Sequence, residues 1–216
     1  MFFRESAGFI KIINECASER FLREVGRKYH YLPEDKTRMK QVAEHLRESA
    51  HREAFWQHRI FNGNGEVLSG VVMTLGKGAD ELQEEYIKNG SLSEGYMVQA
   101  LSGEILQNAY MSYNDWVAEN TSYHVARYYF PGSTADYPIE LLPGLLKELS
   151  VPVVCNEGYC MTPKESVAFY AHLTEDKNVR CLGVCTGCGR KDCPNRMEGG
   201  RPMTYGYARI FGKEFL

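Results

Sequence analysis

The chain has 216 residues, 44% of them hydrophobic and 25% charged, and its formal net charge is −3 at pH 7. This composition is typical of a globular domain, and the weakly acidic balance gives no reason to expect nucleic acid or an anionic membrane surface as a partner. The sequence has no run of about 18 apolar residues that could cross a membrane, and the charges within residues 1–20 argue against a secretion signal. We therefore expect a cytoplasmic protein.

The first elements in chain order are a helix, a hairpin and a second helix. Residues 36–52 have the pattern of a charged amphipathic helix, with Asp35 in position to cap it. Two strand-like runs then flank an Asn-Gly-Asn-Gly sequence at 62–65, where left-handed backbone costs little, so we expect a β-hairpin. Residues 79–89 are predicted to form the next helix.

A longer helix is predicted to begin just after Gly90. Ser91 and Glu94 have the spacing of a capping box, in which the two residues bond each other's backbone amides. Apolar residues then recur at steps of three and four, which is typical of a helix with one buried face: Val98, Leu101, Ile105, Ala109, Tyr113 and Trp116. We expect this helix to lie across the sheet.

The second half of the chain predicts several strands around one short helix. Residues 122–130 are rich in aromatic and β-branched side chains and end at a Pro-Gly turn, which indicates a strand. A helix is expected over 138–149, with further strands over 151–159 and 166–173. Residues 204–211 have the composition of a last strand.

The order of these elements predicts the fold class and the domain organisation. Strands and helices do not alternate strictly, so the chain is expected to form one α+β domain over residues 1–216. Within it, residues 1–20 are predicted to be an N-terminal extension and residues 181–200 a cysteine-rich loop.

Four closely spaced cysteines mark this loop: Cys181, Cys185, Cys188 and Cys193, the last followed by a proline. Such spacing lets several thiolates converge on one metal ion or cluster without a long loop to order. A structural zinc site needs four ligands, and an iron–sulfur cluster would use the same thiolates and add one-electron chemistry. The alternatives are zinc, an iron–sulfur cluster, or reduced thiols in a mobile loop.

Several nucleotide-binding and hydrolase motifs are absent from the sequence. It has no G-x-G-x-x-G after a strand, no phosphate loop G-x-x-x-x-G-K and no G-x-S-x-G elbow. A nucleotide-fold methyltransferase or a hydrolase of that class is therefore poorly supported.

Three stretches together resemble one known family. They are "VVMTLGKGADELQEEY" followed by "ALSGEILQNA", then "VARYYFPGSTADYPIELLPGLLKEL", then "VPVVCNEGYCMTPKESVAFY". In this order they are similar to the activation (reactivation) domain of cobalamin-dependent methionine synthase, including its short stand-alone relatives in anaerobic bacteria. The similarity runs from about Phe21 to the cysteine cluster.

The resemblance implies both a fold and a function. The fold would be a twisted, mainly antiparallel sheet with helices packed around it. The family's domain binds S-adenosylmethionine and closes over a neighbouring cobalamin, where an electron and the sulfonium methyl restore methylcobalamin from its inactive cob(II) state. Because this chain has no recognisable corrinoid-binding module, the cobalamin is expected on a partner, a corrinoid protein or a cobalamin-dependent methyltransferase. The sequence does not indicate the electron donor.

The resemblance also implies a set of S-adenosylmethionine-binding residues: Arg127, Tyr128, Tyr129, Pro131, Gly132, Ser133, Glu157 and Tyr159. The planar fork of Arg127 suits the carboxylate of the ligand, and Gly132 would let backbone amides come close to it. Glu157 would favour the sulfonium electrostatically, and a tyrosine face would add cation–π attraction.

The chain departs from the family at two of these positions. It has "FPGS" where the family usually has Ser-Pro-Gly-Tyr, so that Ser133 replaces a tyrosine, and "NEG" where the family has Thr-Glu-Ser. These departures leave an alternative function from another class, a regulatory module that senses metal or redox state through its cysteines and has lost the methyl-donor site.

Overall fold

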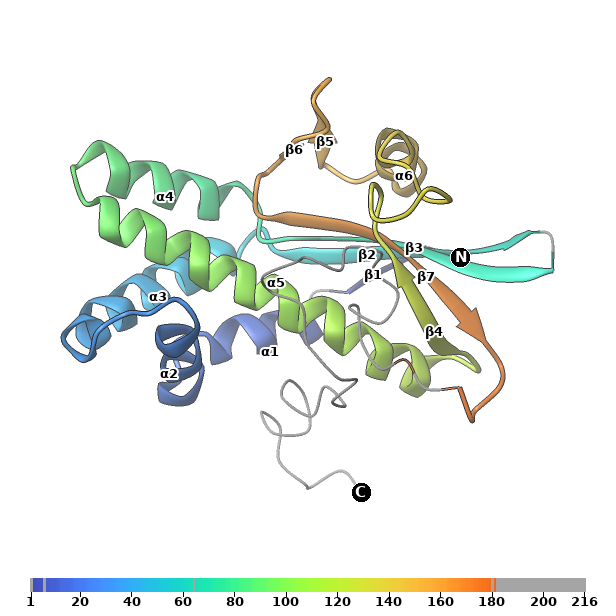
Figure 1. Cartoon of the computed structure of the whole chain (residues 1–216), viewed down its shortest axis with the longest axis horizontal. Coiled ribbons are helices and arrows are strands. Elements are labelled where there is room, and N and C mark those ends of the chain that lie inside the picture. The colour runs from blue at the N-terminus through green and yellow to red at the C-terminus, as the bar shows by residue number, and fades with distance from the viewer. Residues whose placement is uncertain (1, 6, 64, 180, 182–216) are drawn as a thin grey trace.

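The computed structural model describes residues 2–5, 7–63, 65–179 and 181 of the chain. Its centre is an antiparallel sheet with the strand order β1-β2-β3-β7-β4 (Figure 1). The strands are β1 (Phe2–Glu5), β2 (Phe55–Gly63), β3 (Glu66–Thr74), β7 (Ser166–Thr174) and β4 (His124–Tyr129). The predicted α+β class is confirmed.

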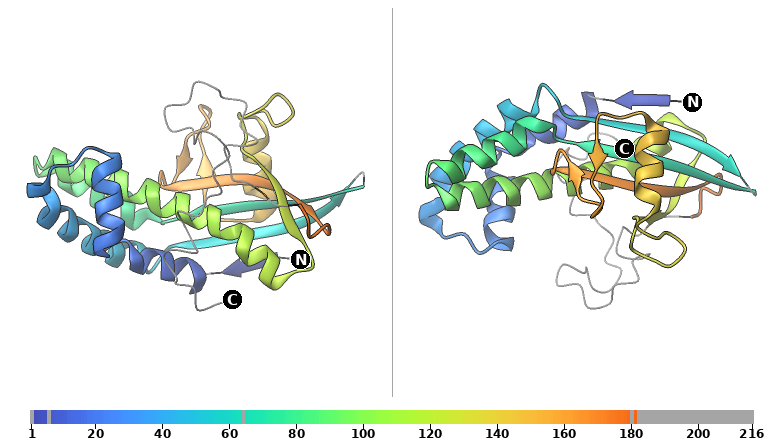
Figure 2. Two further views of the ribbon diagram at one scale, coloured as in Figure 1. Left: turned by 60° about the horizontal axis from the view of Figure 1, so that its bottom comes forward. Right: turned by 90° about the horizontal axis from the view of Figure 1, so that it is seen from above.

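Helices pack on both faces of the sheet, and the two layers are of unequal size (Figures 1 and 2). The larger layer contains α1 (Ala7–Glu15), α2 (Glu19–Lys28), α3 (Lys36–Ala50), α4 (Lys77–Lys88) and α5 (Leu92–Asn120). A short 3₁₀ helix, η1 (Pro33–Asp35), joins α2 to α3. The opposite layer contains α6 (Leu141–Leu149) and a two-stranded pair, β5 (Val154–Cys155) and β6 (Met161–Thr162).

Alternation along the central strands builds a separate core on each face. Val71 and Met73 of β3 and Phe169 of β7 point into the larger layer and are fully buried there. Val72 and Ala168 point the other way and pack against the leucines of α6. Because neighbouring residues of a strand face opposite sides, β3 and β7 are apolar on both faces, as strands at the centre of a covered sheet must be.

The predicted hairpin and the long helix are both confirmed. β2 and β3 pair in register from Phe55 with Thr74 to Gly63 with Glu66. Helix α5 crosses the sheet in Figure 1 and buries all the predicted apolar positions from Val98 to Tyr113, while Trp116 is partly buried against the same core. Burying a large apolar side chain stabilises the fold by roughly 1.5–3 kcal/mol, so this face anchors α5.

Two predicted helix caps are wrong. The Asp35 carboxylate accepts a hydrogen bond from the Leu32 amide at 3.1 Å and so closes η1, while it makes no capping bond to α3. Ser91 stands at the start of α5 without a side-chain capping bond, and Glu94 pairs with Arg38 of α3 at 3.5 Å. In the first case the competing partner is a backbone amide of η1, and in the second it is a side chain of another helix.

The prediction of a strand over 151–159 is also wrong. Within this range only Val154–Cys155 forms a strand, and this strand pairs with β6 outside the main sheet. The Asn156 side chain accepts hydrogen bonds from the amides of Gly158 and Cys160, each at 3.0 Å. This local bonding turns the chain back at once, which competes with extension into a longer strand.

The segment assigned as an N-terminal extension contributes two elements to the fold. β1 pairs with β2 as the edge strand, and α1 inserts Phe9 and Ile13 into the main core with no exposed surface. The strand predicted over 204–211 lies outside the described residues. Within the described ranges, no helix has the length and apolar character that a membrane span requires.

Candidate functional site

The predicted site begins on β4, where successive side chains face opposite sides of the sheet. Arg127 is exposed, and its guanidinium carbon lies 5.2 Å from the centre of the Tyr129 ring. Arg127 and Tyr129 pair with His172 and Tyr170 of β7, on the face of the sheet that carries α6. This arrangement places a cation and an aromatic ring side by side at the edge of the sheet.

Tyr128 lies on the opposite side of the same strand. Its side chain is 4% exposed, and its ring packs edge-on to Phe169 with 5.4 Å between the centroids. Burial, reinforced by the nearby Cys181 thiol, raises the pKa of Tyr128 well above its usual value. Tyr128 is therefore a neutral core residue, separated by the sheet from Arg127 and Tyr129.

The Pro131-Gly132 turn folds the following segment back onto β4. Gly132 has a φ of +86°, and its amide donates to the carbonyl of Tyr137 at 2.7 Å. Ser133 closes the turn, because its amide donates to the Phe130 carbonyl at 2.9 Å and its hydroxyl accepts from the Phe130 amide at 3.2 Å. Glycine permits this positive φ without a Cβ penalty. The turn residues are thus used to shape the loop.

This turn brings together a group of tyrosine rings that the sequence did not predict. Tyr137 stacks on Tyr129 with 4.2 Å between the centroids and 7° between the planes, and it meets Tyr170 at 5.4 Å. We call Tyr129, Tyr137 and Tyr170 the tyrosine stack. Burial raises the pKa of Tyr137 and of Tyr170, so these phenols are neutral at pH 7. Arg127 therefore stands beside uncharged π surface.

Glu157 and Tyr159 belong to the turn between β5 and β6. Glu157 is exposed, whereas Tyr159 has a positive φ of 60° and packs against the leucine cluster of α6. Tyr170 of the tyrosine stack packs against the same cluster. Apart from Tyr128, which faces the main core, the predicted residues thus form two groups, one around Arg127 and one around Glu157. Tyr170 of the first group's tyrosine stack and Tyr159 of the second both pack against the α6 cluster.

Only one of the four predicted metal ligands lies in the described part of the chain. Cys181 is half-buried against the main core, and Cys185, Cys188 and Cys193 lie outside the described residues. Among the described residues, no three His, Cys, Asp or Glu side chains are grouped as metal ligands would be. The cysteine site therefore stays a prediction.

The sequence also did not predict a cluster of polar side chains that lies inside the main core. The Tyr113 hydroxyl donates to Ser69 Oγ at 2.7 Å and lies 2.9 Å from His58 Nδ1. His58 is 2% exposed, and burial lowers its pKa to about 4. A neutral imidazole between a phenol and a serine links β2, β3 and α5, which are distant in sequence, so no local pattern predicts the cluster.

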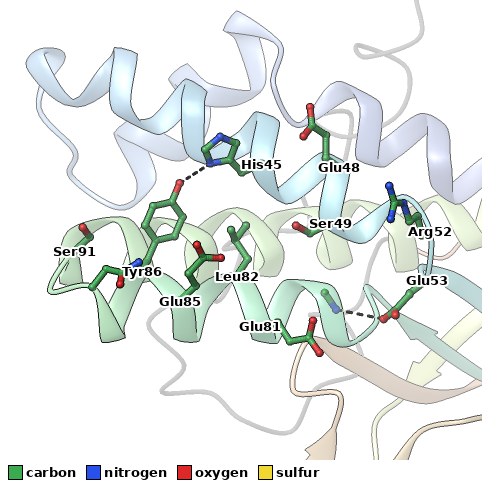
Figure 3. A pocket seen from close by; sticks show the side chains of 12 residues that line it. His45, Glu48, Ser49, Arg52, Glu53, Glu81, Leu82, Glu85, Tyr86 and Ser91 are labelled. Carbon is green, nitrogen blue, oxygen red and sulfur yellow. Dashed lines mark hydrogen bonds between the residues drawn. The ribbon is translucent and has the colours of Figure 1, made fainter.

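An acidic groove of about 700 Å³ lies between α3 and α4 (Figure 3). Both His45, whose Nδ1 lies 2.8 Å from the Tyr86 hydroxyl, and Glu53 line this groove. The other acidic and basic residues of the lining are Glu48, Arg52, Glu81 and Glu85. With more carboxylates than cations, this groove repels the carboxylate of an amino acid ligand. None of the predicted site residues lines it.

The carboxyl groups of Asp80 and Glu165 lie where the start of α4 meets the segment before β7. Asp80, in the first turn of α4, accepts a hydrogen bond from the Lys164 amide at 2.8 Å, and Glu165 is the next residue after Lys164. Burial, together with the negative charge of Asp80, raises the pKa of Glu165 to about 7. Glu165 therefore exchanges a proton near neutral pH.

Comparison of the sequence with the known protein families gave no match, and comparison with curated proteins gave none either.

Proposed function

We propose that the chain binds S-adenosylmethionine and assists the reductive remethylation of a cobalamin carried by a partner. The partner would be a corrinoid protein or a cobalamin-dependent methyltransferase such as methionine synthase. One electron and the sulfonium methyl would together convert cob(II)alamin into methylcobalamin, leaving S-adenosylhomocysteine. On this proposal the chain supplies binding and positioning, and the cofactors supply the chemistry.

The observation that carries the proposal is the position of Arg127 beside the tyrosine stack, directly before the Pro131-Gly132 turn. S-adenosylmethionine carries a carboxylate and a sulfonium cation. The guanidinium can bind the carboxylate through two parallel hydrogen bonds. Because Arg127 and Tyr137 already lie against the Tyr129 ring, the sulfonium would meet the neutral rings of Tyr137 or Tyr170. On this proposal, the tyrosine stack would take over the role of the family tyrosine that Ser133 replaces in this chain.

Calorimetric titration with S-adenosylmethionine tests this function. We expect micromolar binding to the wild-type protein and a roughly 10- to 100-fold higher Kd for Arg127→Ala, because a charged hydrogen-bond partner is lost. Arg52→Ala, which removes an arginine from the acidic groove, is the matched control and should bind normally. S-adenosylhomocysteine should bind more weakly, since it lacks the sulfonium charge.

Two results would contradict the proposal. One is the absence of any binding heat when the donor is added to folded wild-type protein. The other is equal affinity of Arg127→Ala and Arg52→Ala for the donor. The first result would favour the alternative function, in which the scaffold senses metal or redox state through its cysteines.

We further propose that Cys181, Cys185, Cys188 and Cys193 hold zinc or an iron–sulfur cluster, and that a cluster would deliver the electron. Cys181 packs on the main core close to Tyr128, on the opposite face of the sheet from Arg127 and the tyrosine stack, so the electron would have to cross the sheet to reach the donor site. After anaerobic purification, we expect visible charge-transfer absorption and bound iron, both lost in Cys188→Ser. One zinc per chain without such absorption would exclude the electron-transfer role and keep the metal site.

A further inference from the structure

A second groove, of about 350 Å³, lies between α2 and the start of α3. Leu22 and Met39 are buried beneath it, and Leu32, with 58% of its surface exposed, lies at its side. The lining also includes Arg23, Arg27 and Lys36. We propose that this groove binds a small amphiphilic anion, that is, an apolar chain or ring that carries a carboxylate, sulfate or phosphate group.

Gly26 keeps the groove open on its α2 side. It lies inside α2, where glycine weakens a helix relative to alanine. Packing does not explain it, because the nearest atom to a Cβ at this position would be Met39 Cε, at an unstrained 3.9 Å. Gly78 shows the contrast, since a Cβ there would lie 2.5 Å from the Ser49 carbonyl oxygen. At position 26 the missing side chain leaves space that belongs to the groove.

The charges around the groove indicate the sign of the ligand. Arg23 and Arg27 are both exposed and stand one helical turn apart on the side of α2 that lines the groove, so both guanidinium groups can reach the same ligand. Lys36 is paired with Glu19 at 3.3 Å, so the arginines dominate the local charge. On a chain with a net charge of −3, such a positive rim selects an anionic group by local complementarity.

The size of the groove indicates the kind of ligand. A volume of about 350 Å³ lies at the lower end of the range for small-molecule pockets. The apolar floor would hold a hydrocarbon part, and the guanidinium groups would bind the acidic head as planar donors. The site is separate from Arg127 and the tyrosine stack, so the inference stands without the proposed function.

Decanoate is a suitable probe, with decanol as its neutral analogue. We expect saturable one-to-one binding of decanoate by calorimetry and a Kd at least about tenfold higher for decanol, which lacks the charge that the arginines bind. Gly26→Leu should fill the groove and raise the decanoate Kd by about tenfold or more. Gly144→Leu is the matched control, because Gly144 lies in α6 and a Cβ there would have no other atom within 4 Å, so this variant should leave the Kd unchanged.

Charge variants and a binding experiment with lipid vesicles complete the test. The double variant Arg23→Gln/Arg27→Gln should raise the decanoate Kd while Arg52→Gln does not. The fold of each variant is checked by circular dichroism, and S-adenosylmethionine binding should be the same in Gly26→Leu as in the wild type. Equal binding of decanol and decanoate, normal binding by folded Gly26→Leu, or binding only to vesicles that contain phosphatidylglycerol would each overturn the proposal.

Discussion

Replacing Gly76 with alanine is expected to lower the free energy of unfolding by about 2–6 kcal/mol. Gly76 has a φ of +81° and a ψ of 179°, a region that is essentially restricted to glycine and costs other residues about 1–3 kcal/mol. A Cβ at this position would overlap Cβ of Glu53 and lie 3.3 Å from its carbonyl carbon. Overpacking of this kind costs about another 1–3 kcal/mol.

The clash should also disturb the start of α4. Glu53 accepts hydrogen bonds from the amides of Lys77 at 2.7 Å and Gly78 at 3.3 Å, and Figure 3 shows this carboxylate at the helix end. A carboxylate bonded to free amides at a helix N-terminus is stabilising, so its displacement adds to the loss.

Urea denaturation measures the effect, with two glycines as controls. Gly65 and Gly90 have φ values of +80° and +79°, but nothing lies within 4 Å of a Cβ at either position. Their alanine variants should lose only about 1–2 kcal/mol, the cost of left-handed backbone. If Gly76→Ala loses no more than these two variants, the contact with Glu53 is not what requires glycine.

The second large effect is a dependence of stability on pH that arises from Glu165. Its pKa is raised from 4.5 to about 7, so between these values the folded protein keeps a proton that the unfolded chain has released. The free energy of unfolding should therefore fall as the pH rises through this window. A shift of this size corresponds to at most about 3 kcal/mol, at about 1.36 kcal/mol per unit of pKa.

Comparison with Glu165→Gln isolates this contribution, because glutamine stays neutral and all other groups cancel in the difference. The variant should match the wild type near pH 4.5 and become more stable than it by up to about 3 kcal/mol near pH 8. Asp80→Asn is the control for the cause, since removing the neighbouring charge should lower the Glu165 pKa and shrink the difference. A difference that does not change with pH would mean that Glu165 is solvated and ionised like an ordinary surface carboxylate.

The fold was predictable wherever its signal is local. The steps of three and four from Val98 to Tyr113 describe one face of a helix whatever the rest of the chain does, and α5 buries that face. The capping box failed because Glu94 has a partner in Arg38 of α3. β1 was missed because four residues hold too little pattern, and their pairing with β2 joins segments that are far apart in the chain.

The candidate site was predictable only in part, for the same reason. Arg127 and the Pro131-Gly132 turn are close in the sequence, so their closeness in space needs no tertiary structure. The position of Tyr137 depends on the turn that brings its carbonyl to the Gly132 amide, and Tyr170 arrives from another strand. Tyr128 was predicted to belong to the site because it stands next to Arg127 in the sequence. The register of β4 instead directs its side chain into the core.

Local pattern was enough to establish the α+β class, the hairpin, the long helix and an arginine near the end of a strand, because periodicity and turn chemistry act over a few residues. Long-range packing was needed to establish which tyrosines gather beside Arg127, that Glu165 lies next to Asp80, and that Gly26 opens onto a groove. Each of these features depends on which distant elements pack together and on how much water they exclude, and a linear pattern does not encode either.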